Sequence, residues 1–110
     1  MITEELKKNI VERISHAVDV QSIILFGSHA YGTPNEDSDI DLLVVVNKDE
    51  IPKNYDEKSE IYLSVSRAIR HIERQTPVDL LVYTKPEFER FRELGSIFSR
   101  RILKDGVSLL

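Results

Sequence analysis

Two short stretches decide the fold: IILFGS at residues 23–28 and DIDLLVVV at residues 39–46. Each combines a run of apolar residues with small or acidic residues at one end, which is typical of a buried strand with polar groups at its edge. The segment between them is polar, rich in turn-forming residues and without a clear helix pattern. Because such a short connection suits antiparallel neighbours, we expect the first strand to run antiparallel to the second.

Helical patterns surround these two strands. One amphipathic helix is predicted to begin near Thr3, and a long helix to run from Asn54 toward Gln75. The stretch VDLLVY at residues 78–83 forms a third predicted strand. Parallel neighbours need a connection of a dozen or more residues, so the second and third strands with the long helix form a parallel crossover unit. The predicted fold class is α/β (α+β), a small mixed β-sheet flanked by helices, in a single domain of residues 1–110.

The composition excludes several classes of function. The 110 residues include no cysteine, which excludes disulfides, thiolate metal sites and cysteine nucleophiles. The net charge of −4 argues against a domain that binds nucleic acid through bulk electrostatics. No apolar run approaches the roughly 18 residues of a membrane span, so we expect no membrane association and a cytoplasmic location.

Three aspartates form the candidate metal site. Asp39 and Asp41 stand two residues apart in a predicted strand, which places both carboxylates on one face of the sheet. Asp79, one residue into the third strand, adds a carboxylate at the same edge. Acidic residues at strand starts often only face water, but three of them at matching positions of neighbouring strands form a good cradle for Mg²⁺.

Gly27 and Ser28 directly follow the first strand. A glycine with positive φ lets backbone N–H groups and the serine hydroxyl approach a phosphate closely, although a plain turn has the same sequence. Two similar motifs are excluded. Thr33 stands where a Walker A loop needs lysine, and Leu42 stands where an EF-hand loop needs glycine.

Together, the Gly-Ser pair, the spaced acid pair and the later acid resemble the nucleotidyltransferase superfamily typified by DNA polymerase β and kanamycin nucleotidyltransferase. They resemble more closely the minimal nucleotidyltransferases, the MntA-type antitoxins paired with HEPN-domain toxins. The resemblance covers the whole chain and implies a polymerase β palm-like fold. It implies that Asp39, Asp41 and Asp79 bind the two Mg²⁺ ions of a two-metal site and that Asp79 helps to deprotonate the acceptor hydroxyl. It also implies that Gly27 and Ser28 hold the triphosphate.

The implied function is Mg²⁺-dependent transfer of AMP from ATP to a hydroxyl, in particular a tyrosine of a HEPN toxin that forms a hetero-oligomer with this antitoxin. Such an in-line displacement needs carboxylates, metal ions and positioning rather than a covalent nucleophile. Members of the group often carry arginines after the Gly-Ser pair, where this sequence has His29 and Tyr31. Two other functions remain open: neutralisation of a partner by contact alone, and transfer to a small molecule as in antibiotic-modifying relatives. Phe88 and Phe91, three residues apart, are the predicted partner-facing apolar patch.

Overall fold

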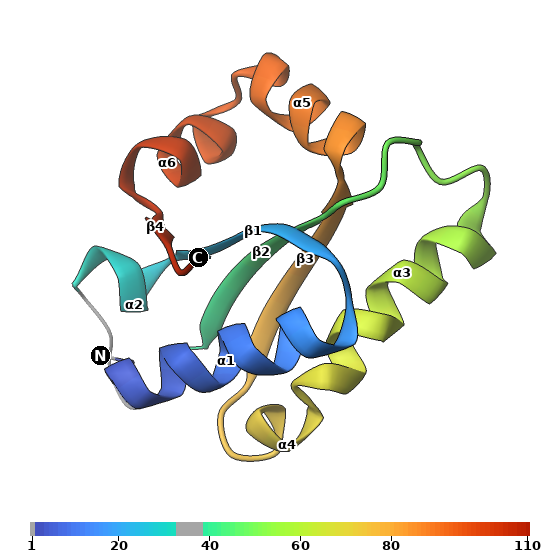
Figure 1. The fold of residues 1–110 in the computed structure, drawn as a ribbon. Helices are drawn as coiled ribbons and strands as arrows, with labels where there is room; N and C mark the ends of the chain where they lie inside the picture. Colours follow the sequence, from blue (N-terminus) through green and yellow to red (C-terminus); the bar gives the residue numbers. More distant parts are fainter. Residues whose placement is uncertain (1, 33–38) are drawn as a thin grey trace.

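The structure is a computed structural model that describes residues 2–32 and 39–110. One or two helices lie between successive strands along the chain (Figure 1). The helices are α1 (Glu4–Ala17), α2 (Ser28–Tyr31), α3 (Tyr55–Ala68), α4 (Arg70–Glu73), α5 (Lys85–Leu94) and α6 (Ile97–Asp105). The strands are β1 (Val20–Phe26), β2 (Ile40–Val46), β3 (Val78–Thr84) and β4 (Val107–Ser108).

The four strands form one mixed sheet in the order β3-β2-β1-β4. β1 pairs antiparallel with β2, and β2 pairs parallel with β3, so both predicted pairings are confirmed. The short strand β4 was not predicted. It pairs antiparallel with β1 at the other edge of the sheet, with Val107 opposite Leu25.

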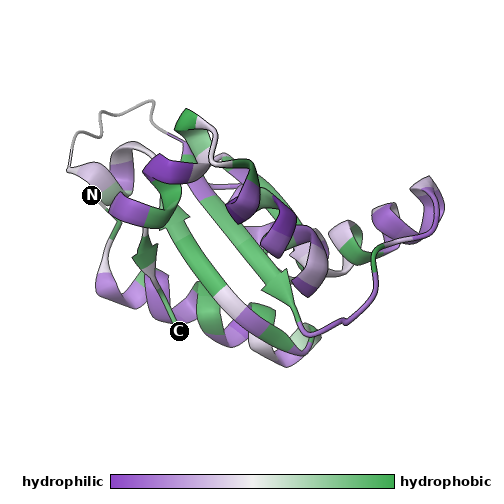
Figure 2. Cartoon of the chain, turned by 90° about the horizontal axis from the view of Figure 1, so that it is seen from above, coloured by the Kyte–Doolittle hydropathy of each residue, from purple (hydrophilic) through white to green (hydrophobic). Residues whose placement is uncertain are grey.

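Helices cover both faces of the sheet, which gives three layers (Figure 1). α1, α3 and α4 pack on one face, where the alternate residues Leu42, Val44 and Val46 of β2 are buried. α5 and α6 pack on the other face, over Leu43 and Val45. Because β2 is buried on both faces it is apolar almost throughout, and the strands are hydrophobic over most of their length in Figure 2.

The predicted helix starts are confirmed by their caps. The Thr3 side chain accepts a hydrogen bond from the Leu6 N–H at 3.1 Å, and the Asn54 side chain accepts one from the Glu57 N–H at 2.9 Å. Each cap satisfies a backbone N–H that the first helical turn leaves without a partner.

The prediction of one continuous helix from Asn54 toward Gln75 is wrong, because the helix is interrupted at Ile69. α3 ends at Ala68, Ile69 leaves the helical conformation with φ −111° and ψ 17°, and α4 begins at Arg70. No proline or glycine marks this break. Ile69 and Ile72 are both buried in the core beneath the sheet, so packing rather than local sequence sets the change of direction.

Candidate active site

The predicted acidic residues meet at the end of the sheet where β2 and β3 begin and β1 ends. In the strand register Asp41 lies opposite Asp79 on one side and opposite Phe26 on the other. Gly27 and Ser28 therefore follow β1 directly beside the acidic pair. Asp39 precedes β2 by one residue, although the strand was predicted to begin there. Because alternate residues share a face, Asp41 lies on the face of Leu43, which α5 and α6 cover.

Gly27 brings the turn after β1 against the acidic pair. Its φ of 72° is the positive value expected for this position, a conformation that other residues adopt only with strain. A Cβ atom at Gly27 would overlap the carboxylate of Asp41. The carbonyl oxygen of Gly27 accepts hydrogen bonds from the N–H groups of Ala30 and Tyr31, which starts the short helix α2. A glycine is thus required here both by conformation and by contact.

The segment after Gly27 differs from the prediction in part. Ser28, His29 and Tyr31 lie in α2, where no helix was expected. The turn-rich segment was predicted to extend to Ser38, and its residues 33–38 lie outside the described part of the chain.

Asp41 has an unusual pKa. The pKa of its carboxyl is raised from 3.8 to about 6, mainly by burial and in addition by the negative charges of Asp79 and Asp39 and a hydrogen bond with Asp79. The charge of His29 acts in the opposite direction and lowers this pKa. The ionised form of Asp41 is therefore destabilised by its surroundings, which is the electrostatic setting that a bound cation would relieve.

The donor set fits Mg²⁺ in kind. Asp41 and Asp79 lie side by side on rigid strands, and the charge of Asp39 acts on Asp41. Within residues 2–32 and 39–110, however, no three His, Asp or Glu side chains converge as a ready-made metal-binding group. Mg²⁺ commonly keeps water and substrate phosphate oxygens among its ligands, so a pair of carboxylates is a sufficient protein contribution to start a site.

The raised pKa of Asp41 predicts a pH effect on stability. Because the folded state binds this proton more tightly than the unfolded state, the free energy of unfolding without metal falls as pH rises from about 4 to about 6, and stays lower above that. Asp41→Asn removes this penalty. After allowance for solvent screening of a half-buried group, we expect the variant to gain about 1 kcal/mol relative to wild type between pH 4.5 and 7.5. Urea unfolding of both proteins in EDTA at pH 4.5 and 7.5 measures the difference in their free energies of unfolding. If the pKa of Asp41 were ordinary, this difference would be the same at both pH values.

A cavity of about 470 Å³ opens beside the acidic pair. Asp41 and Asp79 line it together with Gly27, and aromatic and cationic side chains complete its wall. Those further lining residues are Phe26, Tyr31, Leu80, Leu81, Phe98 and Arg101. Phe98 and Arg101 come from α6 and were missed by sequence reasoning, since no motif or spacing connects α6 with the acid pair.

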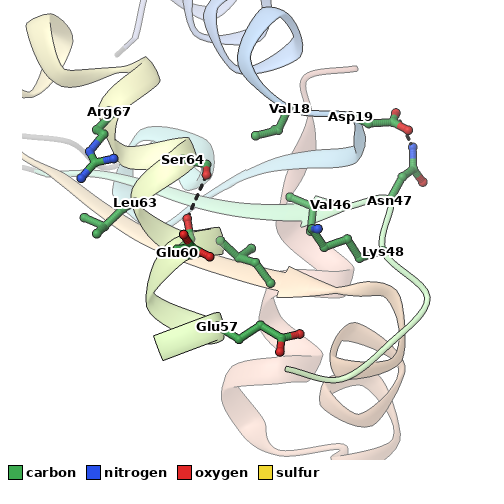
Figure 3. A pocket seen from close by; sticks show the side chains of 11 residues that line it. Val18, Asp19, Val46, Asn47, Lys48, Glu57, Glu60, Leu63, Ser64 and Arg67 are labelled. Carbon is green, nitrogen blue, oxygen red and sulfur yellow. Dashed lines mark hydrogen bonds between the residues drawn. The ribbon is translucent and has the colours of Figure 1, made fainter. Parts of the chain in front are cut away.

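A larger cavity, of about 650 Å³, lies at the opposite end of β2 (Figure 3). It is lined by Val46 and Lys48 on one side and by Glu57, Glu60 and other residues of α3 on the other. Val46 is five residues beyond Asp41 along the strand, a distance of about 17 Å. None of the predicted site residues lies among the described residues that line this cavity, so size alone does not locate the active site.

Comparisons with known proteins place the chain in a family. Residues 5–104 match the family model of the nucleotidyltransferase domain. Curated proteins yielded no match. None of the helices in the described ranges is long and apolar enough to cross a membrane.

Several solved structures share the fold. A candidate nucleotidyltransferase from Sulfolobus solfataricus is 28% identical, with a TM-score of 0.61, over 94% of this chain and 76% of that one. A toxin–antitoxin crystallised with AMP-PNP is 20% identical, with a TM-score of 0.63, over 94% and 72% of the two chains. A doubly substituted variant of the toxin–antitoxin MntA–HpeT is 18% identical, with a TM-score of 0.62 and the same coverage. The family match spans almost the whole chain and the fold agrees with it, so this protein belongs to the nucleotidyltransferase domain family and is a nucleotidyltransferase.

Proposed function

We propose that this nucleotidyltransferase is an antitoxin that transfers AMP from ATP, with Mg²⁺, to a tyrosine hydroxyl of a partner HEPN-domain toxin in the cytoplasm. The 110 residues would act as a single minimal nucleotidyltransferase domain. The observation that carries the proposal is the register pairing of Asp41 with Asp79 beside the Gly27 turn. Two structural neighbours described as toxin–antitoxins, one of them with AMP-PNP, support the choice of partner and donor.

The chain's own residues have separate roles in this reaction. Asp39 and Asp41 hold the metal ions and Asp79 completes the site, while Gly27 and Ser28 contact the triphosphate through backbone N–H groups and a hydroxyl. Bound Mg²⁺ would polarise the phosphate oxygens and stabilise the charge on the departing group. Asp79 is exposed, so an acceptor hydroxyl that arrives from outside can reach it and transfer its proton. The acceptor oxygen then forms a bond to the α-phosphorus, the bond from the α-phosphorus to the bridging oxygen breaks, and pyrophosphate leaves.

Incubation with ATP labelled at the α-phosphate tests the proposal directly. We expect the purified protein with Mg²⁺ to label a co-purified HEPN toxin, to increase the toxin's mass by one or more AMP groups, and to release pyrophosphate. EDTA should abolish all three signals, because the carboxylates alone do not neutralise the triphosphate. The absence of label on the toxin, with the toxin nevertheless bound, would refute AMP transfer to this partner.

Neutralisation by contact alone is a second candidate function, and exposed apolar side chains near the site favour it. Leu94, Ile97 and Phe98 are 76%, 82% and 51% exposed at the junction of α5 and α6. The prediction of a partner-facing patch at Phe88 and Phe91 is wrong for Phe91, which is buried, and Phe88 is partly buried because its ring stacks on Phe91. Single exposed apolar residues are common, but these three lie close together in the chain and one of them, Phe98, lines the cavity beside the acidic pair, so they form an apolar surface that a toxin can contact.

A further inference from the structure

Arg101 is the positively charged residue of the candidate active cavity. Of the described residues that line this cavity, two are carboxylates, Asp41 and Asp79, and Arg101 is the single cation. The Gly27–Ser28 turn contributes no formal charge. A triphosphate that entered this cavity would thus meet two negative side chains, and among the described lining residues Arg101 is the charged group that would attract it before metal binds.

Packing of α6 on the sheet holds Arg101 in place. The Phe98 ring packs edge-on against Phe26, the residue before Gly27, with ring centroids 5.7 Å apart. The next turn of α6 is anchored by Ile102, which is buried among the residues above the sheet. Arg101 lies between these two anchors, so its side chain extends over α2, where its guanidinium lies 4.2 Å from the centre of the Tyr31 ring.

The present contacts of Arg101 leave it able to bind an anion. Its Nε donates to Asp105 at 2.7 Å in an i,i+4 pair, and its side chain is 56% exposed. Exposed pairs of this kind contribute only about 0.3–0.5 kcal/mol, so exchanging the carboxylate for a phosphate costs little. A guanidinium also carries four N–H donors on its two terminal nitrogens, arranged to bind phosphate oxygens in pairs.

We propose, on the basis of the function proposed above, that Arg101 binds the phosphate chain of the nucleotide donor. It would supply, from α6, the arginine that the segment after Gly27 lacks. Tyr31 then has a role of its own, because its ring holds the guanidinium above the turn that contacts the same phosphates.

Binding measurements separate this role from a merely structural one. We would titrate Mg²⁺ with AMP-PNP, tripolyphosphate or AMP into wild type and Arg101→Gln by calorimetry. The variant should bind AMP-PNP and tripolyphosphate about 10-fold more weakly, the loss of one charge-assisted contact, whereas AMP affinity should change much less. Arg101→Lys, which keeps the charge but not the paired donors, should lie between the two.

Two further variants serve as controls. Arg100→Gln removes the adjacent, exposed arginine of α6, which does not line the cavity, and should leave all three affinities unchanged. Asp105→Asn removes the ion-pair partner of Arg101 and should leave AMP-PNP affinity unchanged or raise it. If the Arg101–Asp105 pair only stabilised the fold, Arg101→Gln and Asp105→Asn would change AMP-PNP affinity by the same amount. Equal weakening of AMP and AMP-PNP by Arg101→Gln, or no weakening of either, would overturn the assignment.

Failure of the Arg101 assignment and failure of the proposed function give different experimental results. If wild type transfers AMP to the toxin and Arg101→Gln binds AMP-PNP as tightly as wild type, only the role of Arg101 falls. If wild type binds neither AMP-PNP nor tripolyphosphate in the presence of Mg²⁺, both proposals are refuted together.

Discussion

Asp41→Asn is expected to abolish AMP transfer, with a rate at least about 10³-fold below wild type. The substitution keeps the shape of the side chain and removes its negative charge. That charge interacts with the charges of both Asp39 and Asp79. Loss of a metal-binding carboxylate removes several kcal/mol of stabilisation from the transition state, and about 4 kcal/mol corresponds to this factor. Transfer of labelled AMP to the toxin measures the rate.

Stability distinguishes this loss from unfolding. Because Asp41 is destabilised when ionised, Asp41→Asn should melt at or above the temperature of wild type in EDTA, and Mg²⁺ with AMP-PNP should stabilise it less. Asp39→Asn should lose activity similarly. Asp49→Asn is a matched control, because Asp49 is an exposed aspartate paired with Lys85 beyond the other end of β2. Full labelling by both Asp39→Asn and Asp41→Asn would contradict the assignment of the metal site.

The same variant separates catalysis from contact. If the protein neutralises its toxin by AMP transfer, Asp41→Asn should still bind the toxin and fail to neutralise it. If contact suffices, the variant should neutralise the toxin as well as wild type does. Asp41 lies near the start of β2 and is not one of the exposed apolar residues of α5 and α6. Growth rescue of toxin-expressing cells, with co-purification as the measure of binding, distinguishes the two outcomes.

Gly27→Ala is expected to reduce AMP transfer by about 100-fold or more while the protein remains folded. A Cβ atom at this position overlaps the Asp41 carboxylate, so either the carboxylate or the turn must move. A displacement of about 1 Å at a reacting centre can reduce a rate by about 10². The combination of φ 72° and ψ −163° adds a conformational cost of about 1–3 kcal/mol to the stability of the variant.

Gly32→Ala is the matched control for this experiment. Gly32 also has a positive φ, of 82°, but a Cβ atom there meets no atom of residues 2–32 or 39–110 within 4 Å. Gly32→Ala, in the left-handed region, should lose about 1–2 kcal/mol in urea unfolding. Gly27→Ala should lose more, because its ψ of −163° lies in a region that only glycine adopts readily, and it alone should lose activity and Mg²⁺-dependent nucleotide binding. Equal activity in the two variants would show that the contact between Gly27 and Asp41 is unimportant.

Much of the fold follows from local patterns in the sequence. The strands at residues 39–46 and 78–83 are apolar and β-branched, and the connection between them is long enough for the parallel pairing that the structure shows. Helix starts at Thr3 and Asn54 depend on side chains that act within one turn, which makes them readable from sequence. The break at Ile69 was not predictable in this way, because it satisfies the core beneath the sheet rather than a local preference.

The candidate site likewise has a part that local sequence patterns predict and a part that they do not. The sequence by itself determined which three aspartates and which Gly-Ser pair are the candidates and that they lie at the same ends of neighbouring strands, because strand alternation and strand ends are local features. The register then pairs Asp41 with Asp79. Only the tertiary structure decided that Arg101 and Phe98 border the same cavity. Their position depends on how α6 packs on the sheet through aromatic and aliphatic contacts between residues far apart in the chain, and such contacts leave no spacing in the sequence to read.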